Sequence, residues 1–254
     1  MSTCFLVYHR LTGDAAGRRF HDVAPAMLKR HLDLLDRLGA SASDGPPVLR
    51  LGDGRGVALT FDDGSMDHLA AARCLDRRGW RGAFFIPAGR IGGAGRLGRA
   101  DVAALAASGH VVGCHGWSHR PFDRLTAGEL AAELADSREC LGALTAGPVD
   151  WLAPPGGIWT PAAAAAARRL GFRHIRGTGW GVAPAGWDKE GWDKDPDAIL
   201  PAIVLSGHVG SRTLGWLLKA RPNGALGRLA GVKAGIKRLV GEAVWDGVRE
   251  AMRR

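Results

Sequence analysis

Short apolar segments alternate with longer segments of helical periodicity along most of the chain. The short segments predict β-strands at residues 4–8, 57–61, 82–87, 110–115, 172–176 and 202–206. The longer ones predict helices at residues 24–38, 67–78, 100–108, 126–144 and 161–170, with glycine-rich loops at 40–56 and 89–98. Repeated strand–helix units predict a parallel sheet with helical crossovers, in which ligands bind at the C-terminal ends of the strands.

The helix expected at residues 126–144 has the clearest start signal. Thr126 is a good N-cap, and Glu129 three residues later completes a capping box. Leu130, Leu134 and Leu141 then share one face. This face predicts a helix that packs on the sheet.

The composition is that of an ordinary globular protein, with 254 residues of which 46% are apolar and 23% charged. This length suits one large α/β domain or two small ones. No apolar run is long enough to span a membrane, and the first residues lack the pattern of an export signal, so a cytoplasmic location is expected. The four cysteines have no metal-binding spacing and are expected to be free thiols.

Acidic and histidine side chains follow two of the predicted strands. Asp62 and Asp63 come directly after residues 57–61, and His115 and His119 follow at the end of residues 110–115. Asp-Gly is also a common turn pair, and a lone histidine is more often structural. Two imidazoles and one carboxylate, however, supply three ligands, which is the number of protein ligands that catalytic zinc usually has, and histidines four apart can converge on a helical turn or in a tight loop. The pattern predicts a divalent metal, with zinc preferred.

These motifs resemble those of the polysaccharide deacetylase family, also called the NodB homology domain or carbohydrate esterase family 4. The resemblance rests on residues 60–64 (TFDDG), 109–119 with the histidine pair, and 152–157. It extends over about residues 4–210, with an N-terminal extension before TFDDG. It implies a distorted (β/α) barrel and a hydrolase that acts on the carbon–nitrogen bond of an N-acetyl group on a sugar.

The resemblance also implies the metal ligands and the general base. Asp63, His115 and His119 would bind the metal, and Asp62 would take a proton from the attacking water. The oxyanion would be held by the metal and by a backbone N–H near Gly156, which follows Pro155.

The proton donor to the leaving amine is expected to be His208. The segment Leu205-Ser206-Gly207-His208 loosely matches a late Leu-x-His motif of the family, with one residue more between leucine and histidine. A loop histidine that follows a strand is the alternative.

Three positions depart from the pattern of many family members. Ala153 stands where an arginine that steadies the base is common, although some branches also have alanine there. Gly116 follows the first histidine in place of serine or threonine, and Gly156 stands where an aromatic residue is common. These departures predict a more open cleft, or one shaped for something other than a long glycan.

Other signals favour structural roles. Gly93, Gly95 and Gly98 match a dinucleotide fingerprint but lack its strand and acidic residue, so a flexible loop that could border the active site is expected. His9 ends the first predicted strand, where it lines the cleft or supports the fold. Tryptophans at 180, 187 and 192 suit sugar faces, but they more often pack in a core.

The last part of the chain, residues 218–254, has a different character from residues 1–217, which form the expected catalytic domain. It holds nine lysines and arginines against three acidic residues, a large part of the formal net charge of +9. Apolar residues recur in it at helical spacing. Such a helix packs on the barrel or lies on an anionic membrane surface. Six glycines weaken it in isolation, so it needs a partner.

The sequence therefore predicts a metal-dependent hydrolase that removes an N-acyl group, acetyl in the first instance, from an amino sugar of a glycan or lipid-linked saccharide. A lipid-linked sugar at the inner membrane face would suit a cytoplasmic enzyme with a basic segment, and no nucleic acid is expected as a partner. One alternative is a hydrolase of another non-peptide carbon–nitrogen bond. The other is a non-catalytic binding protein that uses its basic surface.

Overall fold

The structure is a computed structural model that describes residues 2–13, 20–45, 47–178, 183, 187 and 199–219. Trp180, Trp192 and nearly all of the basic segment at 218–254 lie outside the described residues. Among the residues described, no helix is both long enough and apolar enough to cross a membrane.

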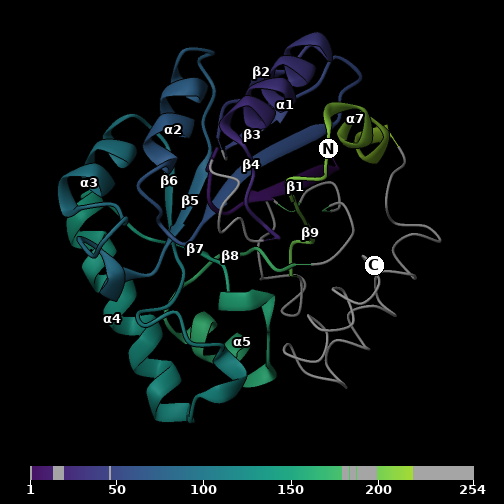
Figure 1. The fold of residues 1–254 in the computed structure, drawn as a ribbon. Helices are drawn as coiled ribbons and strands as arrows, with labels where there is room; N and C mark the ends of the chain where they lie inside the picture. The colour runs from purple at the N-terminus through teal and green to yellow at the C-terminus, as the bar shows by residue number, and fades with distance from the viewer. Residues whose placement is uncertain are drawn as a thin grey trace, which may run out of the picture.

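The centre of the fold is a nine-stranded sheet (Figure 1). Its strands are β1 (Thr3–Tyr8), β2 (Ser41–Ala42), β3 (Val48–Arg50), β4 (Gly56–Asp62), β5 (Ala83–Ile86), β6 (Val111–Cys114), β7 (Trp151–Leu152), β8 (His174–Ile175) and β9 (Ala202–Val204). Parallel pairing runs β9-β1-β4-β5-β6-β7-β8. An isolated bridge between Arg176 and Leu200 links the two ends of this order. The strands thus follow a distorted barrel, as predicted.

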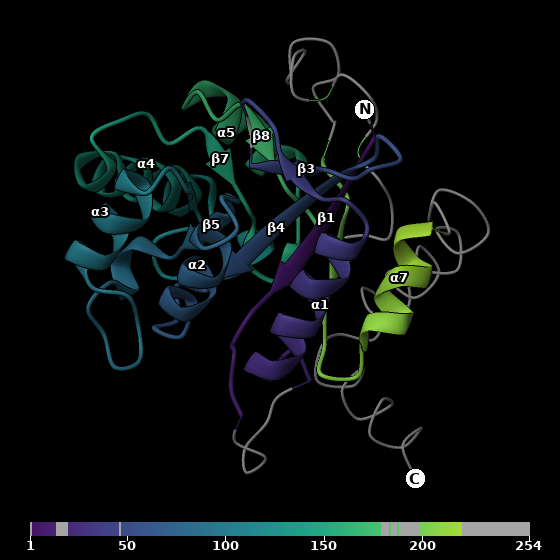
Figure 2. The same cartoon turned by 90° about the horizontal axis from the view of Figure 1, so that it is seen from above.

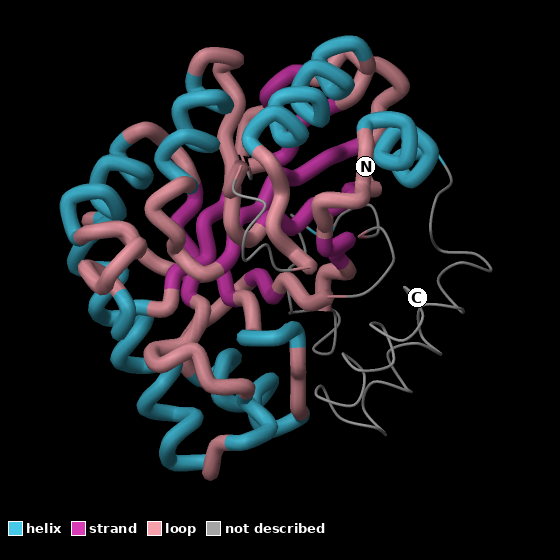
Figure 3. Tube along the Cα trace, in the orientation of Figure 1, coloured by secondary structure: helices cyan, strands magenta, loops and turns pink. Residues whose placement is uncertain are grey.

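Helices lie around these strands (Figures 1 and 3). They are α1 (Pro25–Arg37), α2 (His68–Asp76), α3 (Arg99–Ala107), α4 (Ala127–Thr145), α5 (Pro161–Arg169) and α7 (Ser211–Lys219), with short 3-10 turns η1 (Ala88–Arg90), η2 (Phe122–Arg124) and η3 (Pro155–Gly157). Figure 2 shows α7 beside α1, far from it in sequence. The predicted helices are confirmed with ends shifted by a few residues.

The predicted start of α4 is confirmed in detail. Thr126 Oγ1 accepts a hydrogen bond from the Glu129 N–H at 3.3 Å, and the Glu129 carboxylate accepts one from the Thr126 N–H at 2.8 Å. Leu130, Leu134 and Leu141 are buried as expected. The cap fixes where α4 begins, and therefore which of its side chains face the sheet.

Two strand regions were not expected from the sequence. Residues 40–56 were predicted to be a loop, but β2 and β3 form an antiparallel hairpin there that extends the sheet beside the first half of β4. The prediction was wrong because so short a hairpin in a glycine- and proline-rich segment has no clear period-two pattern. β7 is equally short and takes its pairing from β6 and β8.

The core has two parts that are separated by the sheet. The larger part packs the strands against the helices and includes Leu6, Leu59 and Leu134. The smaller part includes Phe5, Phe85, Trp151 and Trp187. The rings of Phe5 and Trp187 lie 5.2 Å apart, and those of Trp151 and Trp187 lie 5.7 Å apart. Trp187 is therefore a packing residue, the reading that the sequence favoured for these tryptophans.

Candidate metal centre and catalytic site

Asp63, His115 and His119 converge at the C-terminal ends of β4 and β6. Their candidate ligand atoms all lie within 4.8 Å of one another. His119 Nε2 is 2.8 Å and His115 Nε2 is 3.5 Å from Asp63 Oδ1. The structure thus brings together the three residues that the sequence proposed as ligands.

A tight loop, and not a helical turn, carries the two histidines. His119 has a φ of 67° and Gly116 a φ of 71°, both in the left-handed region. A Cβ on Gly116 would lie 3.0 Å from the Glu133 carboxylate and 3.6 Å from Pro155. Serine or threonine, which the family often has here, would be strained in this conformation, and glycine is the residue that fits.

The His115 ring is held in one orientation by a hydrogen bond from its Nδ1. Its Nδ1 lies 2.7 Å from the Ala153 carbonyl oxygen, which can only accept, so Nδ1 carries the proton. The other ring nitrogen, Nε2, faces Asp63. A carbonyl behind a metal-ligating imidazole is the usual arrangement in metal sites.

Glu133 of α4 holds the loop between His115 and His119, called the histidine loop below, through two hydrogen bonds. One of its carboxylate oxygens accepts hydrogen bonds from the backbone N–H groups of Trp117, at 2.6 Å, and Ser118, at 2.9 Å. Glu133 is buried, and Ser137 one turn later donates to the Gly116 carbonyl at 3.1 Å. Two side chains of one helix therefore fix the loop between the two histidines.

Asp62 directly precedes Asp63 and is paired with a buried arginine. Arg176 Nη2 lies 2.5 Å from both carboxylate oxygens of Asp62, and the side chain of Arg176 is completely buried. Burial raises the pKa of Asp62, but Arg176, with smaller contributions from His115 and His9, outweighs burial and holds this pKa below its ordinary value. Asp62 is therefore ionised at neutral pH.

The pKa of Asp63 is also lowered. Burial raises it, and hydrogen bonds from His115 and His119 more than compensate. Arg96 donates to the Asp63 carbonyl oxygen at 2.6 Å, and the Leu97 N–H donates to the Gly64 carbonyl at 2.9 Å. The glycine-rich loop at 89–98 therefore borders the site, as the sequence analysis allowed.

The polysaccharide deacetylase family model matches residues 51–175. Over these residues the chain is similar to the polysaccharide deacetylase family. The family comprises hydrolases that act on carbon–nitrogen amide bonds, and the match confirms the resemblance inferred from the motifs. A curated relative, an uncharacterized 30.6 kDa protein of Geobacillus stearothermophilus, is 28% identical over 168 residues. That alignment covers 61% of this chain and 60% of the relative's length.

Solved deacetylase structures share this fold. A deacetylase (PplD) of Streptococcus pyogenes, in complex with acetate, has a TM-score of 0.72 at 18% identity and covers 87% of this chain and 98% of its own. A polysaccharide deacetylase of Bacillus cereus has a TM-score of 0.72 at 18% identity over 86% of this chain and 69% of its own. IcaB from Ammonifex degensii has a TM-score of 0.66 at 21% identity over 85% of this chain and 97% of its own.

The third family motif lies beside the histidine loop. Pro155 is buried near Gly116, and Gly156 is exposed with a φ of 66° in η3. A Cβ on Gly156 would meet no atom within 4 Å. The backbone N–H of Gly156 as an oxyanion donor remains a prediction from the resemblance.

His208 is exposed in the turn after β9, with its ring 6.2 Å from that of Phe20. Phe20 contacts His21 at 5.0 Å, and His21 stacks on His9 at 5.1 Å. His9 ends β1, and its pKa is lowered by burial despite the opposing charges of Asp62 and Asp63. His9 therefore borders the carboxylates, whereas His208, which the sequence analysis predicted as the proton donor, connects to His9 through the rings of Phe20 and His21.

Sequence reasoning missed Arg176 and Glu133. Arg176 carries one signal, because it alternates with His174 along the predicted strand and so places a charge on one face of it. Glu133 has no such signal, since a glutamate on a long helix is usually exposed.

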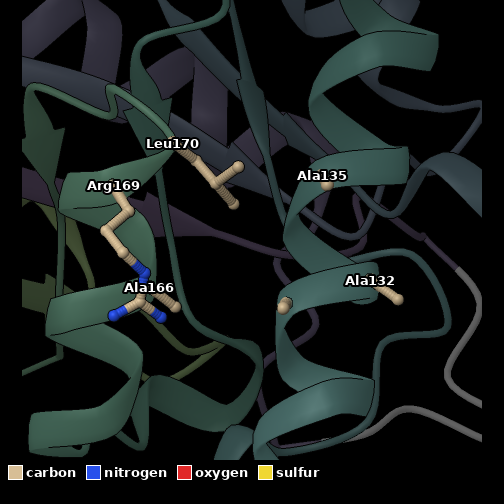
Figure 4. A pocket seen from close by; sticks show the side chains of 6 residues that line it. Ala132, Ala135, Ala166, Arg169 and Leu170 are labelled. Carbon is tan, nitrogen blue, oxygen red and sulfur yellow. The ribbon is translucent and has the colours of Figure 1, made fainter.

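A cavity of about 300 Å³ lies between α4 and α5 (Figure 4). Alanines 131, 132, 135 and 166 line it together with Arg169 and Leu170. None of these residues belongs to the site, so this cavity plays no part in the chemistry considered below.

Proposed function

We propose that the chain is a metal-dependent hydrolase that removes an N-acyl group, acetyl in the first instance, from an amino sugar. One observation carries the proposal: a complete aspartate–histidine–histidine ligand set lies directly beside an ionised, buried aspartate. The match to the polysaccharide deacetylase family model supports the reaction type.

The donor set fits a single divalent ion. Nitrogen and oxygen ligands of zinc lie about 2.0–2.2 Å from the ion, so two ligands of one ion are at most about 4.4 Å apart. The spacing within 4.8 Å needs only a small closing movement. Asp63, with its lowered pKa, and His115, with Nδ1 protonated, offer their unprotonated atoms to the ion. We therefore assign Asp63, His115 and His119 as ligands and zinc as the preferred metal.

When bound, the ion would lower the pKa of a water molecule and polarise the acyl carbonyl. The Asp62 carboxylate accepts the proton of the attacking water. The Gly156 N–H donates to the developing oxyanion from η3. His208 then protonates the leaving amine, and His9 is the second candidate for this step because it lies nearer to the carboxylates.

The deciding experiment combines metal analysis with acetate release. Purified protein loaded with zinc should release acetate from N-acetylated sugar oligomers or their lipid-linked forms. Asp62→Asn should keep its metal and lose about 10²–10⁴-fold in rate, which is the usual value of general base catalysis. Asp136→Asn, at an exposed position of α4, serves as the matched control.

Three outcomes would contradict the proposal. Full activity of Asp62→Asn would remove the base from Asp62. A zinc-loaded wild type that releases no acetate but hydrolyses another carbon–nitrogen bond would favour the alternative hydrolase. A protein that binds saccharide without hydrolysing anything would favour the binding protein.

We also propose that the basic segment 218–254 holds the enzyme at an anionic membrane surface, where a lipid-linked sugar would be its substrate. The support is the nine basic residues of the segment at helical spacing with apolar ones. Full-length protein should float with anionic liposomes, and a version ending at Lys219 should not. That end point leaves α7 whole, including buried Leu217 and Leu218. Equal binding of both versions would refute the idea.

A further inference from the structure

Arg176 is the largest of the side chains that are completely buried among the described residues. It lies directly after β8, 114 positions from Asp62 in the sequence. A buried guanidinium without a carboxylate is strongly destabilising, so a chain keeps one only where it is paired. The partner in this fold is Asp62, the base of the proposed reaction.

The inner face of the sheet has room for this long side chain. Phe85 is the neighbour of Asp62 in the register of β4 and β5, and Gly113 is the neighbour of Phe85 in that of β5 and β6. A Cβ on Gly113 would lie only 2.6 Å from the Phe85 ring. The ring therefore lies over Gly113, and the Arg176 guanidinium lies 4.9 Å from the ring centroid. Arg176 reaches Asp62 along this ring.

Ala153 is the other small residue on this face. β7 and β8 pair with Trp151 opposite His174 and Leu152 opposite Ile175, so the next pair in this register is Ala153 and Arg176. The Arg176 N–H donates to the Leu152 carbonyl at 2.9 Å, which continues that register. Because side chains alternate along a strand, Ala153 and Arg176 point to the same face.

We propose that Arg176 is the positioning residue of Asp62 and replaces, from β8, the arginine expected at position 153 on β7. Alanine at position 153 then does not leave Asp62 without an arginine. It is the small neighbour that leaves the inner face open for Arg176. The proposal rests on the proposed function only where it concerns catalysis, because the pairing itself is a property of the fold.

The geometry explains what the pairing does. Asp62 and Asp63 are consecutive residues, and the negative charges of their carboxylates repel each other. Arg176 Nη2 contacts both oxygens of Asp62, while Nη1 donates to the Gly177 carbonyl at 3.1 Å. The guanidinium is thus fixed at its own strand and holds the Asp62 carboxylate in one orientation. Asp63 therefore contacts His115 and His119, and the guanidinium contacts Asp62.

The pairing is tested first in metal-free protein, without any assay of activity. Arg176→Met should lower the Tm by roughly 10 °C, because it leaves a buried carboxylate unpaired. Asp62→Asn combined with Arg176→Met should recover most of this loss, since the unpaired charge is removed. Arg173→Met, at an exposed position next to β8, is the control and should leave the Tm within about 2 °C. Additive losses in the double variant would overturn the pairing.

The catalytic consequence is tested by moving the arginine back. Arg176→Ala should lower kcat about 10²-fold, as expected for a misplaced catalytic group, with KM and metal content nearly unchanged. Ala153→Arg in the Arg176→Ala background should restore at least a tenth of the wild-type kcat. Ala153→Arg alone should not improve kcat, because Arg176 already occupies the space.

Failures of the two proposals are distinguishable. Unchanged kcat in metal-loaded Arg176→Ala overturns the positioning role, whatever the Tm. If Arg176→Ala does not fold, Arg176→Lys replaces it, and a kcat equal to that of the wild type overturns the role. An inactive wild type refutes the proposed function, and the metal-free Tm cycle then decides the pairing by itself.

Discussion

Glu133 should control the metal affinity of the site although it is not itself a ligand. Its carboxylate accepts two backbone N–H groups in the loop between His115 and His119, at 2.6 and 2.9 Å. Hydrogen bonds to a buried charged group contribute about 1.5–3 kcal/mol each. Glu133→Ala leaves both N–H groups unpaired and should free the loop that carries His119.

The expected loss in zinc affinity follows from these contacts. Removing an outer-shell partner of a metal site usually costs about 10–100-fold in affinity, or about 1.4–2.8 kcal/mol at 1.4 kcal/mol per tenfold. This is below the full strength of the two hydrogen bonds, because water can enter the opened loop and satisfy part of it. Glu133→Gln keeps an acceptor oxygen and loses only the charge, so its loss should be below tenfold.

Competition with a chromophoric chelator measures the zinc affinity, and thermal unfolding of metal-free protein measures the cost to the fold. Glu139→Ala is the matched control, because Glu139 is exposed on the same helix. If Glu133→Ala and Glu139→Ala bind zinc equally tightly, the loop does not depend on Glu133 and the reasoning is wrong.

Three further predictions concern the site and the buried His31 of α1. Asp63→Ala and His119→Ala should each lose zinc while the fold is retained, and wild-type zinc content in both would exclude this ligand set. His208→Ala should lower kcat about 10²-fold and remove the alkaline limb of the pH–rate profile; if only His9→Gln does so, His9 is the proton donor. Burial lowers the pKa of His31 from its ordinary 6.5, so its share of stability is present above that pH and is lost as the pH falls below it. In unfolding experiments, His31→Gln should therefore reduce the loss of stability between pH 7 and 5.5, by up to about 1.4 kcal/mol per pH unit; an unchanged slope would show that His31 titrates normally.

The convergence of Asp63, His115 and His119 could be predicted because their signals are local. Asp63 directly follows one apolar strand, and His115 directly follows another. Parallel strands bring such ends to one edge whatever the details of packing. The same reasoning gave the order of strands and helices, and it gave the capping box of α4.

Arg176, Glu133 and the short strands could not be predicted, because each depends on a partner that is far away in the sequence. The role of Arg176 depends on its contacts with Asp62 and with the ring of Phe85. Nothing in residues 172–178 indicates that these two residues are its partners. Glu133 is defined by a loop that precedes it on the chain. β2, β3 and β7 are too short to have a pattern, and they exist because an already formed neighbour offers its backbone.

The place of β1 in the sheet has a consequence for how the protein is made. β1 comes first in the chain and is buried throughout, with β4 on one side and β9 on the other. Its second neighbour leaves the ribosome only after Val204, when most of the chain has been synthesised. Contacts between such distant segments close large loops and slow folding. An emerging chain therefore carries one open, apolar edge on β1 until β9 has been synthesised.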